Sequence, residues 1–321
     1  MAKQKHNASK LRSLSHGRPP TLTLPSNTSR SNLSSQTTRT VIRKHHNLLK
    51  AHTRAVAAKD EVLAEALQKE IDENGGLAHY QAASILGQSS LRGGDTSKHL
   101  LEWLSPIRQA MRWNGQAQTH SDKGASASEQ ISGLGRRLRM LDVGALSTDT
   151  AAGRSGLFDM TRIDLNSQEK GIMQQDFMQR PLPRNDEERF DIVCLSLVVN
   201  YVPDAKVRGE MLRRVQEFLV KPEVYTRQDE ASTADRAGLS SFLPALWLVL
   251  PAPCVTNSRY MTVQRLGDIM ASLGYELLES KITAKLAYFL FRHSGTALSK
   301  SFAKVEVNPG RSRNNFVILT D

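Results

Sequence analysis

Three short segments place a glycine and several acidic residues at the ends of apolar runs. Residues 141–144 resemble a strand that ends in a glycine turn, Asp164 ends a second apolar strand, and Asp176-Phe177 follows as an acid beside an aromatic ring. Glycine lets backbone approach a ligand closely, and a carboxylate at a strand tip can accept hydrogen bonds from two ribose hydroxyls. These residue types at these spacings predict a site for an adenosine-containing cofactor.

The same residues favour a methyl donor over a dinucleotide. Gly144 is followed by Ala145 and Leu146, whereas a pyrophosphate requires further glycines in this turn. S-adenosyl-L-methionine is therefore the predicted cofactor, with S-adenosylhomocysteine as product. The expected contacts are the methionine part against Gly144, the ribose at Asp164, the adenine edge at Asp176 and the adenine face at Phe177. Asp142, taken to lie inside the turn, could order it or meet the cofactor's amino group through water.

Each of these residues also has a purely structural interpretation. Gly144 could simply end a strand, and Asp142 could stabilise the turn. Asp164 could cap a neighbouring segment, and Phe177 could be a core residue beside a solvated Asp176. Ser196, which follows a further apolar run at the edge where ligands bind in open α/β sheets, is a cofactor candidate or a plain strand-end serine.

Strands and helices alternate from residue 136 onward, which predicts an α/β fold with a mostly parallel sheet. A late antiparallel pair suits a Rossmann-like class I methyltransferase sheet of seven strands. Helices are expected over residues 204–220 and 262–273. The predicted strands are residues 139–143, 157–163, 190–195, 245–250, 275–281, 287–291 and 315–319.

Four regions are expected along the chain. Residues 1–39 are rich in Ser, Thr, Lys and Arg and predict a disordered basic tail. Residues 40–113 predict a helical region, with apolar residues at helical spacing over 40–73, a stop at residues 74–76, a second helix over 77–87 and a third from residue 97 to about 113. Residues 114–135 predict a linker, and residues 136–321 predict the cofactor-binding domain.

The positive charge is concentrated at the amino terminus. Residues 1–60 contain 12 Lys or Arg and a single acid, Asp60, which accounts for the whole net charge of +11. A basic, acid-poor arm is an electrostatic handle for a polyanion, and charge alone allows RNA, DNA or an anionic membrane. Cys194 and Cys254 lie in apolar runs, and the chain lacks zinc-ligand spacing, so no metal is expected. With no apolar run long enough to span a bilayer, we expect a soluble intracellular protein without a membrane partner.

Several longer motifs resemble the fungal 25S rRNA adenine-N1 methyltransferases. The segments at residues 141–147, 163–166, 190–203, 250–261 and 313–316 carry the resemblance, and residues 80–88 and 92–97 fit the same family. The resemblance covers about residues 75–320. It implies methyl transfer to N1 of an adenine in large-subunit rRNA or a pre-ribosomal particle, and a nuclear, nucleolar location. It also implies that Arg92 clamps the cofactor carboxylate, with a weaker role for Gln88.

The polar residues after the fourth and fifth strands are candidates for holding a flipped adenine. Amide and phenol groups can contact the edge and face of a base; these catalytic candidates are Asn200, Tyr201, Asn257 and Tyr260, with Arg259 beside them. N1 of adenine has its own lone pair, so the reaction requires positioning more than a general base. Animal relatives of the family resemble S-adenosylmethionine sensors of the TOR pathway, so a non-catalytic sensor is the alternative. The sequence indicates neither the target adenine nor the oligomeric state.

Overall fold

The computed structural model describes residues 34–87, 94–109, 136–167, 169–225, 239–298 and 300–320. The chain divides after Ser34, and all the described helices and strands belong to the compact unit Ser35–Asp321, which is the second of the two. The predicted cofactor residues Gln88 and Arg92, and the predicted linker, lie outside the described residues.

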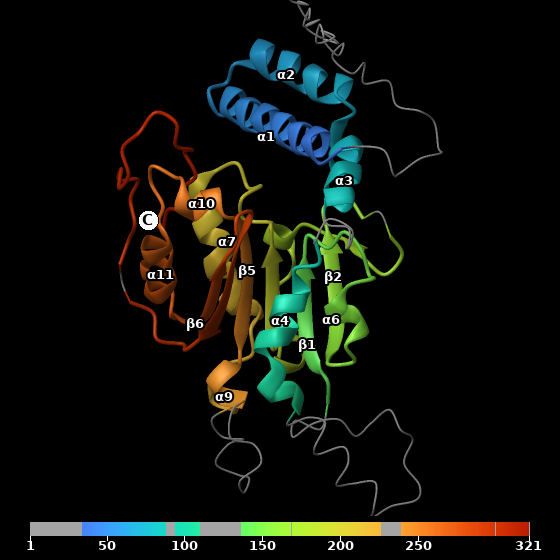
Figure 1. Ribbon diagram of the computed structural model, residues 1–321, viewed down its shortest axis with the longest axis vertical. Helices are drawn as coiled ribbons and strands as arrows, with labels where there is room; N and C mark the ends of the chain where they lie inside the picture. Colours follow the sequence, from blue (N-terminus) through green and yellow to red (C-terminus); the bar gives the residue numbers. More distant parts are fainter. Residues whose placement is uncertain are drawn as a thin grey trace, which may run out of the picture. The chain divides into compact units, whose positions relative to one another are not determined.

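A seven-stranded sheet forms the centre of the second unit (Figure 1), in the order β3-β2-β1-β4-β5-β7-β6. The first five strands pair in parallel, while β7 runs antiparallel to both β5 and β6. This arrangement confirms the α/β fold and the late antiparallel pair. The strands are β1 (Leu138–Val143), β2 (Phe158–Asp164), β3 (Met173–Gln174), β4 (Ile192–Ser196), β5 (Ala245–Pro251), β6 (Tyr275–Ile282) and β7 (Leu286–His293).

The sheet changes direction between β1 and β4. From β1 the chain adds β2 and β3 on one side, and it then crosses back to place β4 on the other side of β1. In open α/β sheets a ligand crevice forms outside the carboxyl ends of the strands at such a point. The segments after β1, β2 and β4 therefore contain the positions that matter most for function.

The predicted strand over residues 315–319 is wrong. The seventh strand is β3, and residues 315–319 instead run in extended form beside helix α7 (Ala205–Phe218). Leu319 N donates to Ala205 O (3.0 Å), and Arg208 Nη1 donates to Val317 O (2.6 Å). Phe316, Val317 and Ile318 of this segment are buried, and burial alone produces the sequence pattern that suggested a strand.

Three helices precede the sheet: α1 (Ser35–Ala57), α2 (Glu61–Glu73) and α3 (Gly76–Gly87). The apolar pattern over residues 40–73 covers two helices, because Lys59 adopts a positive φ of 58° and Asp60 caps α2 by accepting from Leu63 N (3.0 Å). The predicted stop at residues 74–76 is present. Helix α1 begins within the stretch that composition assigned to the tail, so the tail's predicted end at residue 39 falls inside a helix.

Further helices flank the sheet. Those expected over residues 204–220 and 262–273 are α7 and α11 (Val263–Ser272), capped by Asp204 and Thr262. The helix predicted from residue 97 to about residue 113 is interrupted: α4 (Ser97–Trp103) ends at Leu104, residues 105–109 are again helical, and residues 110–113 lie outside the described chain. The remaining helices are α6 (Ala151–Arg154), α9 (Leu239–Phe242) and α10 (Pro253–Thr256).

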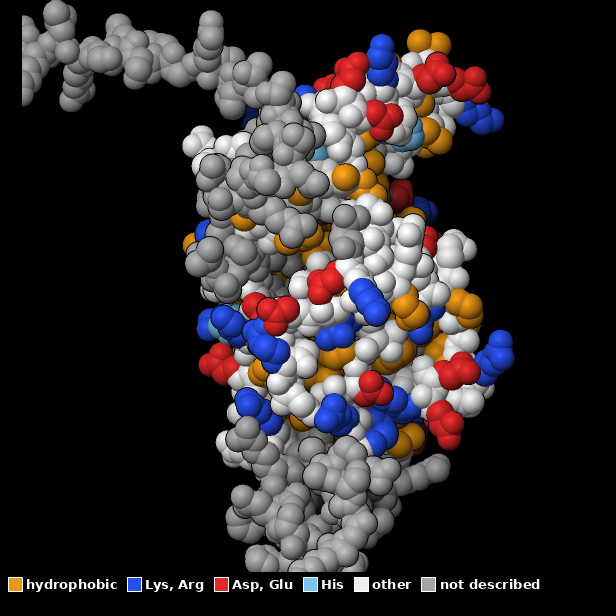
Figure 2. Space-filling model, turned by 90° about the vertical axis from the view of Figure 1, so that its right-hand side faces the viewer, with side chains coloured by type: hydrophobic (Ala, Val, Ile, Leu, Met, Phe, Trp, Pro, Cys, Tyr) orange, Lys and Arg blue, Asp and Glu red, His pale blue; other side chains and the backbone are white. Residues whose placement is uncertain are grey.

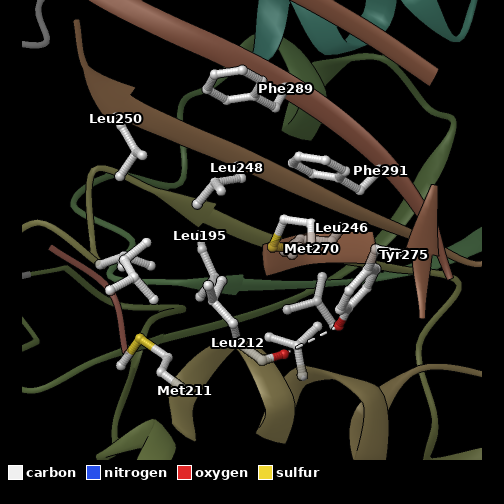
Figure 3. Packing of buried hydrophobic residues seen from close by; sticks show 14 of the residues in the cluster. Leu195, Met211, Leu212, Leu246, Leu248, Leu250, Met270, Tyr275, Phe289 and Phe291 are labelled. Atoms are coloured by element: carbon white, nitrogen blue, oxygen red, sulfur yellow. Dashed lines mark hydrogen bonds between the residues drawn. The ribbon is translucent and has the colours of Figure 1, made fainter. Parts of the chain in front are cut away.

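Strand β5 is buried on both faces. Leu246, Leu248 and Leu250 point into the core layer that contains α7 and α11, together with Phe289 and Phe291 of β7 (Figure 3). The alternate residues, including Trp247, point into a second layer that contains α4. An uninterrupted apolar run is typical of a strand covered on both sides. The core thus fixes the sheet edge from which the candidate site residues extend.

Charged side chains of both signs are intermingled on the face shown in Figure 2. In the described part of the chain, no helix is long and apolar enough to cross a membrane.

Candidate functional site

Gly144 occupies the turn that follows β1. Its φ is +74°, and a Cβ built there would lie 2.7 Å from Cγ2 of Val198 in the segment after β4. Its N–H donates to Ile163 O of β2 (2.8 Å). The residue must therefore be glycine both for its backbone conformation and for the close approach of Val198. The turn is held directly between the ends of β2 and β4.

Asp164 ends β2, as predicted, and it contacts the helical region. Its Oδ1 accepts hydrogen bonds from Asn166 N (2.8 Å) and from Gln81 Nε2 of α3 (3.1 Å). Gln81 also exchanges hydrogen bonds with the backbone carbonyl (2.8 Å) and side chain (2.6 Å) of Asn166. Burial raises the pKa of Asp164, while its hydrogen bonds oppose that shift. Within the described chain, both recorded bonds involve Oδ1, so Oδ2 is the oxygen available to a ribose.

An aromatic cluster joins α1 and α3 to the segment after β4. The ring of Tyr201 lies edge-on to His46 of α1 (4.0 Å between centroids) and to Tyr80 of α3 (5.3 Å). Burial raises the pKa of both tyrosine hydroxyls, and it lowers that of His46 to about 3. Both phenols and the imidazole are thus neutral at physiological pH. Tyr201 acts here as a packing residue between elements, whatever contact it makes with a substrate.

Asn200 is the most unusual polar residue at this edge. Its side chain is 7% exposed, and its Oδ1 has no hydrogen-bond partner among the described residues. A buried amide oxygen without a partner costs free energy, so such groups need a specific explanation. Nearby, Leu197 adopts a positive φ of 62°, which is strained for a branched side chain. An unpaired buried acceptor and a strained residue together indicate a segment shaped for a ligand.

Asp142 lies within β1, not inside the turn as predicted. It pairs in register with Arg162 of β2 and Cys194 of β4, on the sheet face that α4 covers. Burial raises its pKa to about 6, although the Cys194 thiol and the charge of Arg162 oppose that shift. At the end of β4, Ser196 Oγ lies 2.9 Å from Thr96 Oγ1, just before α4. The start of α4 therefore meets the carboxyl edge at β1 and β4.

Asp176 and Phe177 form a local cap and a core contact. Asp176 Oδ1 accepts from Met178 N (2.8 Å) at the start of a short 3-10 helix, Phe177–Gln179. Phe177 is 3% exposed, and its ring packs against Phe218 of α7 (5.2 Å between centroids). These are the contacts of a core phenylalanine, so a role in covering adenine remains a prediction that its surroundings do not favour.

Asn257 and Tyr260 lie beside the carboxyl-terminal segment. Asn257 is exposed at the end of α10, and its carbonyl accepts from Asn314 N (3.0 Å). Lys304 Nζ lies 4.6 Å from the centroid of the Tyr260 ring. Between them, the fully buried Ser258 donates to Phe316 O (2.6 Å). This motif therefore anchors the end of the chain as well as presenting two polar side chains.

The structure brings most of the predicted site residues to one edge of the sheet, but in separate groups. Asp164 and Tyr201 contact the helical region, Asp142 and Ser196 face α4, and Asn257 and Tyr260 contact the carboxyl-terminal segment. No recorded contact within the described chain joins the last pair to the others.

No binding role was predicted for Gln81, Tyr80 and Thr96, although they make the contacts from the helical side. The only available signal was their position inside the two upstream motifs. Among the described residues, no group of three His, Cys, Asp or Glu side chains could hold a metal ion.

Comparisons with known proteins agree on one family. Residues 65–318 match the family model described as "25S rRNA (adenine(2142)-N(1))-methyltransferase, Bmt2". A Saccharomyces cerevisiae protein, 25S rRNA (adenine(2142)-N(1))-methyltransferase, is 34% identical over 280 residues, covering 85% of this chain and 69% of its own length. A Schizosaccharomyces pombe protein, 25S rRNA adenine-N(1) methyltransferase, is 33% identical over 280 residues, covering 87% and 89%.

Among solved structures, an O-methyltransferase family protein from Burkholderia thailandensis gives a distant likeness. Its TM-score is 0.38 at 10% identity, with 84% of this chain and 75% of that chain covered.

Proposed function

Because this chain belongs to the Bmt2 family of 25S rRNA adenine-N1 methyltransferases, we propose that it transfers a methyl group from S-adenosyl-L-methionine to N1 of an adenine in large-subunit rRNA. The observation that carries the proposal is the buried Asn200 amide with its unpaired Oδ1, placed after β4 in one of the family's motifs.

The residues at the carboxyl edge fit S-adenosylmethionine. The Gly144 turn brings backbone to the switch point between β1 and β4, where a side chain would collide with Val198. Asp164 offers a carboxylate at the tip of β2, oriented by Gln81 and Asn166, for the ribose hydroxyls. When bound, the cofactor supplies an electrophilic methyl group on a sulfonium.

The protein's task toward the base is to orient it. N1 of adenine attacks with its own lone pair, so no residue needs to remove a proton first. The exocyclic amino group of adenine is a donor that would satisfy Asn200 Oδ1, and this contact would fix which ring nitrogen faces the methyl group. A base in a Watson–Crick pair hides N1, so the target adenine must be unpaired or flipped out.

The partner and location follow from the same proposal. The substrate is rRNA, free or within a pre-ribosomal particle, and the protein works in the nucleus, in the nucleolus. The basic amino terminus supports RNA as partner, since residues 1–33 contain six Lys or Arg and no acid.

The decisive experiment is methyl transfer by the full-length purified protein. Large-subunit rRNA lacking the modification is incubated with S-adenosylmethionine, digested and analysed by nucleoside mass spectrometry. We expect N1-methyladenosine. Cofactor-loaded, folded protein that yields only N6-methyladenosine would overturn the assignment. If it yields no methylated base on naked rRNA or on pre-ribosomes, a non-catalytic sensor would take its place.

A further inference from the structure

Helix α1 carries a line of cationic side chains along one side. Arg39, Arg43, Lys50 and Arg54 are spaced by four, seven and four residues, which places them within an arc of about 60° on an α-helix. The two outermost are about 22 Å apart at the helical rise of 1.5 Å per residue. We call these four residues the α1 basic stripe.

The stripe is not neutralised within the described chain. Helix α1 contains no acidic residue, and none of the four side chains has a recorded ion pair there. Lys44, on a different side of α1, provides the contrast: its Nζ lies 2.7 Å from Asn74 Oδ1 and 3.4 Å from Glu70 Oε1. Lys44 is thus paired with α2, whereas the cations of the stripe are left for a partner.

The stripe borders the candidate site. His46, whose ring contacts Tyr201 next to Asn200, lies on α1 about 20° from the direction of Arg39. Half-buried Lys50 lies near Arg208 of α7 and Cys254 of α10. Its pKa is lowered by burial and further by Arg208 and Arg54, while Cys254 opposes the shift. Positive charge thus accumulates where α1 meets the carboxyl edge of the sheet.

We propose that the α1 basic stripe binds the phosphate backbone of the RNA substrate beside the target adenine. The proposal rests on the proposed function, and it adds a folded RNA-binding surface that is separate from the amino-terminal residues. The side chains around the stripe favour RNA over a membrane. Gln36 and Asn47 are exposed on the same side of α1 and can donate to phosphate, whereas a membrane-binding helix presents large apolar residues.

The test removes three exposed cations and measures the salt dependence of RNA binding. The variant is Arg39→Gln/Arg43→Gln/Arg54→Gln in the full-length protein. The control, Arg137→Gln/Arg184→Gln/Lys221→Gln, removes the same charge from exposed positions that precede β1 and β4 or follow α7. A third variant with lysine at positions 39, 43 and 54 keeps the charge.

For the stripe variant we expect the slope of log affinity against log salt to fall by about 2, with binding about 10- to 50-fold weaker near physiological salt. The control and the lysine variant should keep the wild-type slope. Cofactor affinity should be unchanged. KM for RNA should rise, while kcat at saturating RNA should stay at the wild-type value. Equal slopes for the stripe and control variants would overturn the proposal.

Failure of the enzyme assignment is separable, because RNA binding is measured without methyl transfer. If wild-type protein forms no N1-methyladenosine but the salt slope of RNA binding falls in the stripe variant, the methyl-transfer chemistry is rejected and the RNA-binding surface is supported. If wild-type protein methylates rRNA and the stripe variant keeps the wild-type salt slope, the enzyme assignment is supported and the RNA-binding surface is rejected. Binding to anionic vesicles that depends on the stripe, without binding to RNA, would also reject the proposal.

Discussion

Gln81 on α3 donates a 3.1 Å hydrogen bond to Oδ1 of Asp164 at the tip of β2, across 83 residues of sequence. The same amide binds the carbonyl and side chain of Asn166. The helical region is thereby tied to the acid that we expect to hold the cofactor ribose. Cofactor binding and the position of α3 must influence each other through this carboxylate.

Replacing Asp164 with alanine should abolish measurable cofactor binding without unfolding the protein. Each charge-assisted hydrogen bond to a ribose hydroxyl stabilises the complex by about 1.5–3 kcal/mol, so losing two should weaken binding at least a hundredfold. Calorimetric titration with S-adenosylhomocysteine measures this directly. Asp159→Asn, at an exposed position of the same strand, should bind like wild type. Unchanged affinity in Asp164→Ala would show that the ribose lies elsewhere.

Asn200→Ala should reduce turnover while leaving cofactor affinity within about twofold. The substitution removes the buried oxygen proposed to accept from the adenine amino group, an interaction of about 1–3 kcal/mol and hence roughly 5- to 150-fold in rate. Tyr260→Ala should act in the same direction, because its ring is a candidate for contacting the face of the base. Single-turnover methyl transfer and calorimetry on the same preparations separate the two effects. Loss of cofactor binding in Asn200→Ala would place the residue in the cofactor site instead.

Acid should weaken the packing of α1 through His46. Its pKa is about 3 in the folded protein, against an ordinary value of 6.5, because burial disfavours the charged ring. The stabilisation is therefore complete above pH 6.5 and is lost as the pH falls toward 3. The free energy of unfolding should fall by about 1–2 kcal/mol by pH 5 because of His46. His46→Phe keeps a ring against Tyr201 without titrating, and Nε2 has no partner to lose among the described residues. Chemical unfolding at pH 8 and pH 5 should show a smaller acid loss in the variant; equal losses would contradict this origin.

Deleting residues 1–33 should leave cofactor affinity intact and reduce the salt dependence of RNA binding. The segment contributes six cations and no acid, and each lost phosphate contact lowers the log–log slope by about 0.7 on single-stranded RNA. The cut at residue 33 preserves α1, which a cut at residue 39 would shorten. Filter binding across a salt series provides the measurement. An identical slope in the two proteins would mean that the segment does not contact RNA.

Local chemistry made much of this fold predictable. A few neighbouring residues are enough to identify the buried strand β5 from its apolar run and the starts of α7 and α11 from their caps, Asp204 and Thr262. The tip of β2 was predictable for the same reason, since an acid that directly follows the last apolar residue of a strand lies at the sheet edge.

Contacts between distant segments were not predictable. Nothing near Gln81 indicates that it binds Asp164, and nothing near Phe177 indicates that its ring faces Phe218. Residues 315–319 are buried like a strand but satisfy their backbone on a helix, a difference that apolar patterning cannot express. Tertiary packing, rather than local propensity, decided each of these positions.

A pair of helix glycines provides a sharp test of how the carboxyl-terminal segment is held. A Cβ on Gly209 of α7 would overlap the carbonyl oxygen of Leu319, whereas a Cβ on Gly267 of α11 would meet nothing within 4 Å. Gly209→Ala should therefore destabilise the protein by about 1–3 kcal/mol through overpacking. Gly267→Ala should stabilise it by about 0.5–1 kcal/mol, because alanine is the better helix former. Urea unfolding of both variants measures whether each substitution lowers or raises the free energy of unfolding. If Gly209→Ala also proved stabilising, the carboxyl-terminal segment could not pack against α7 as described.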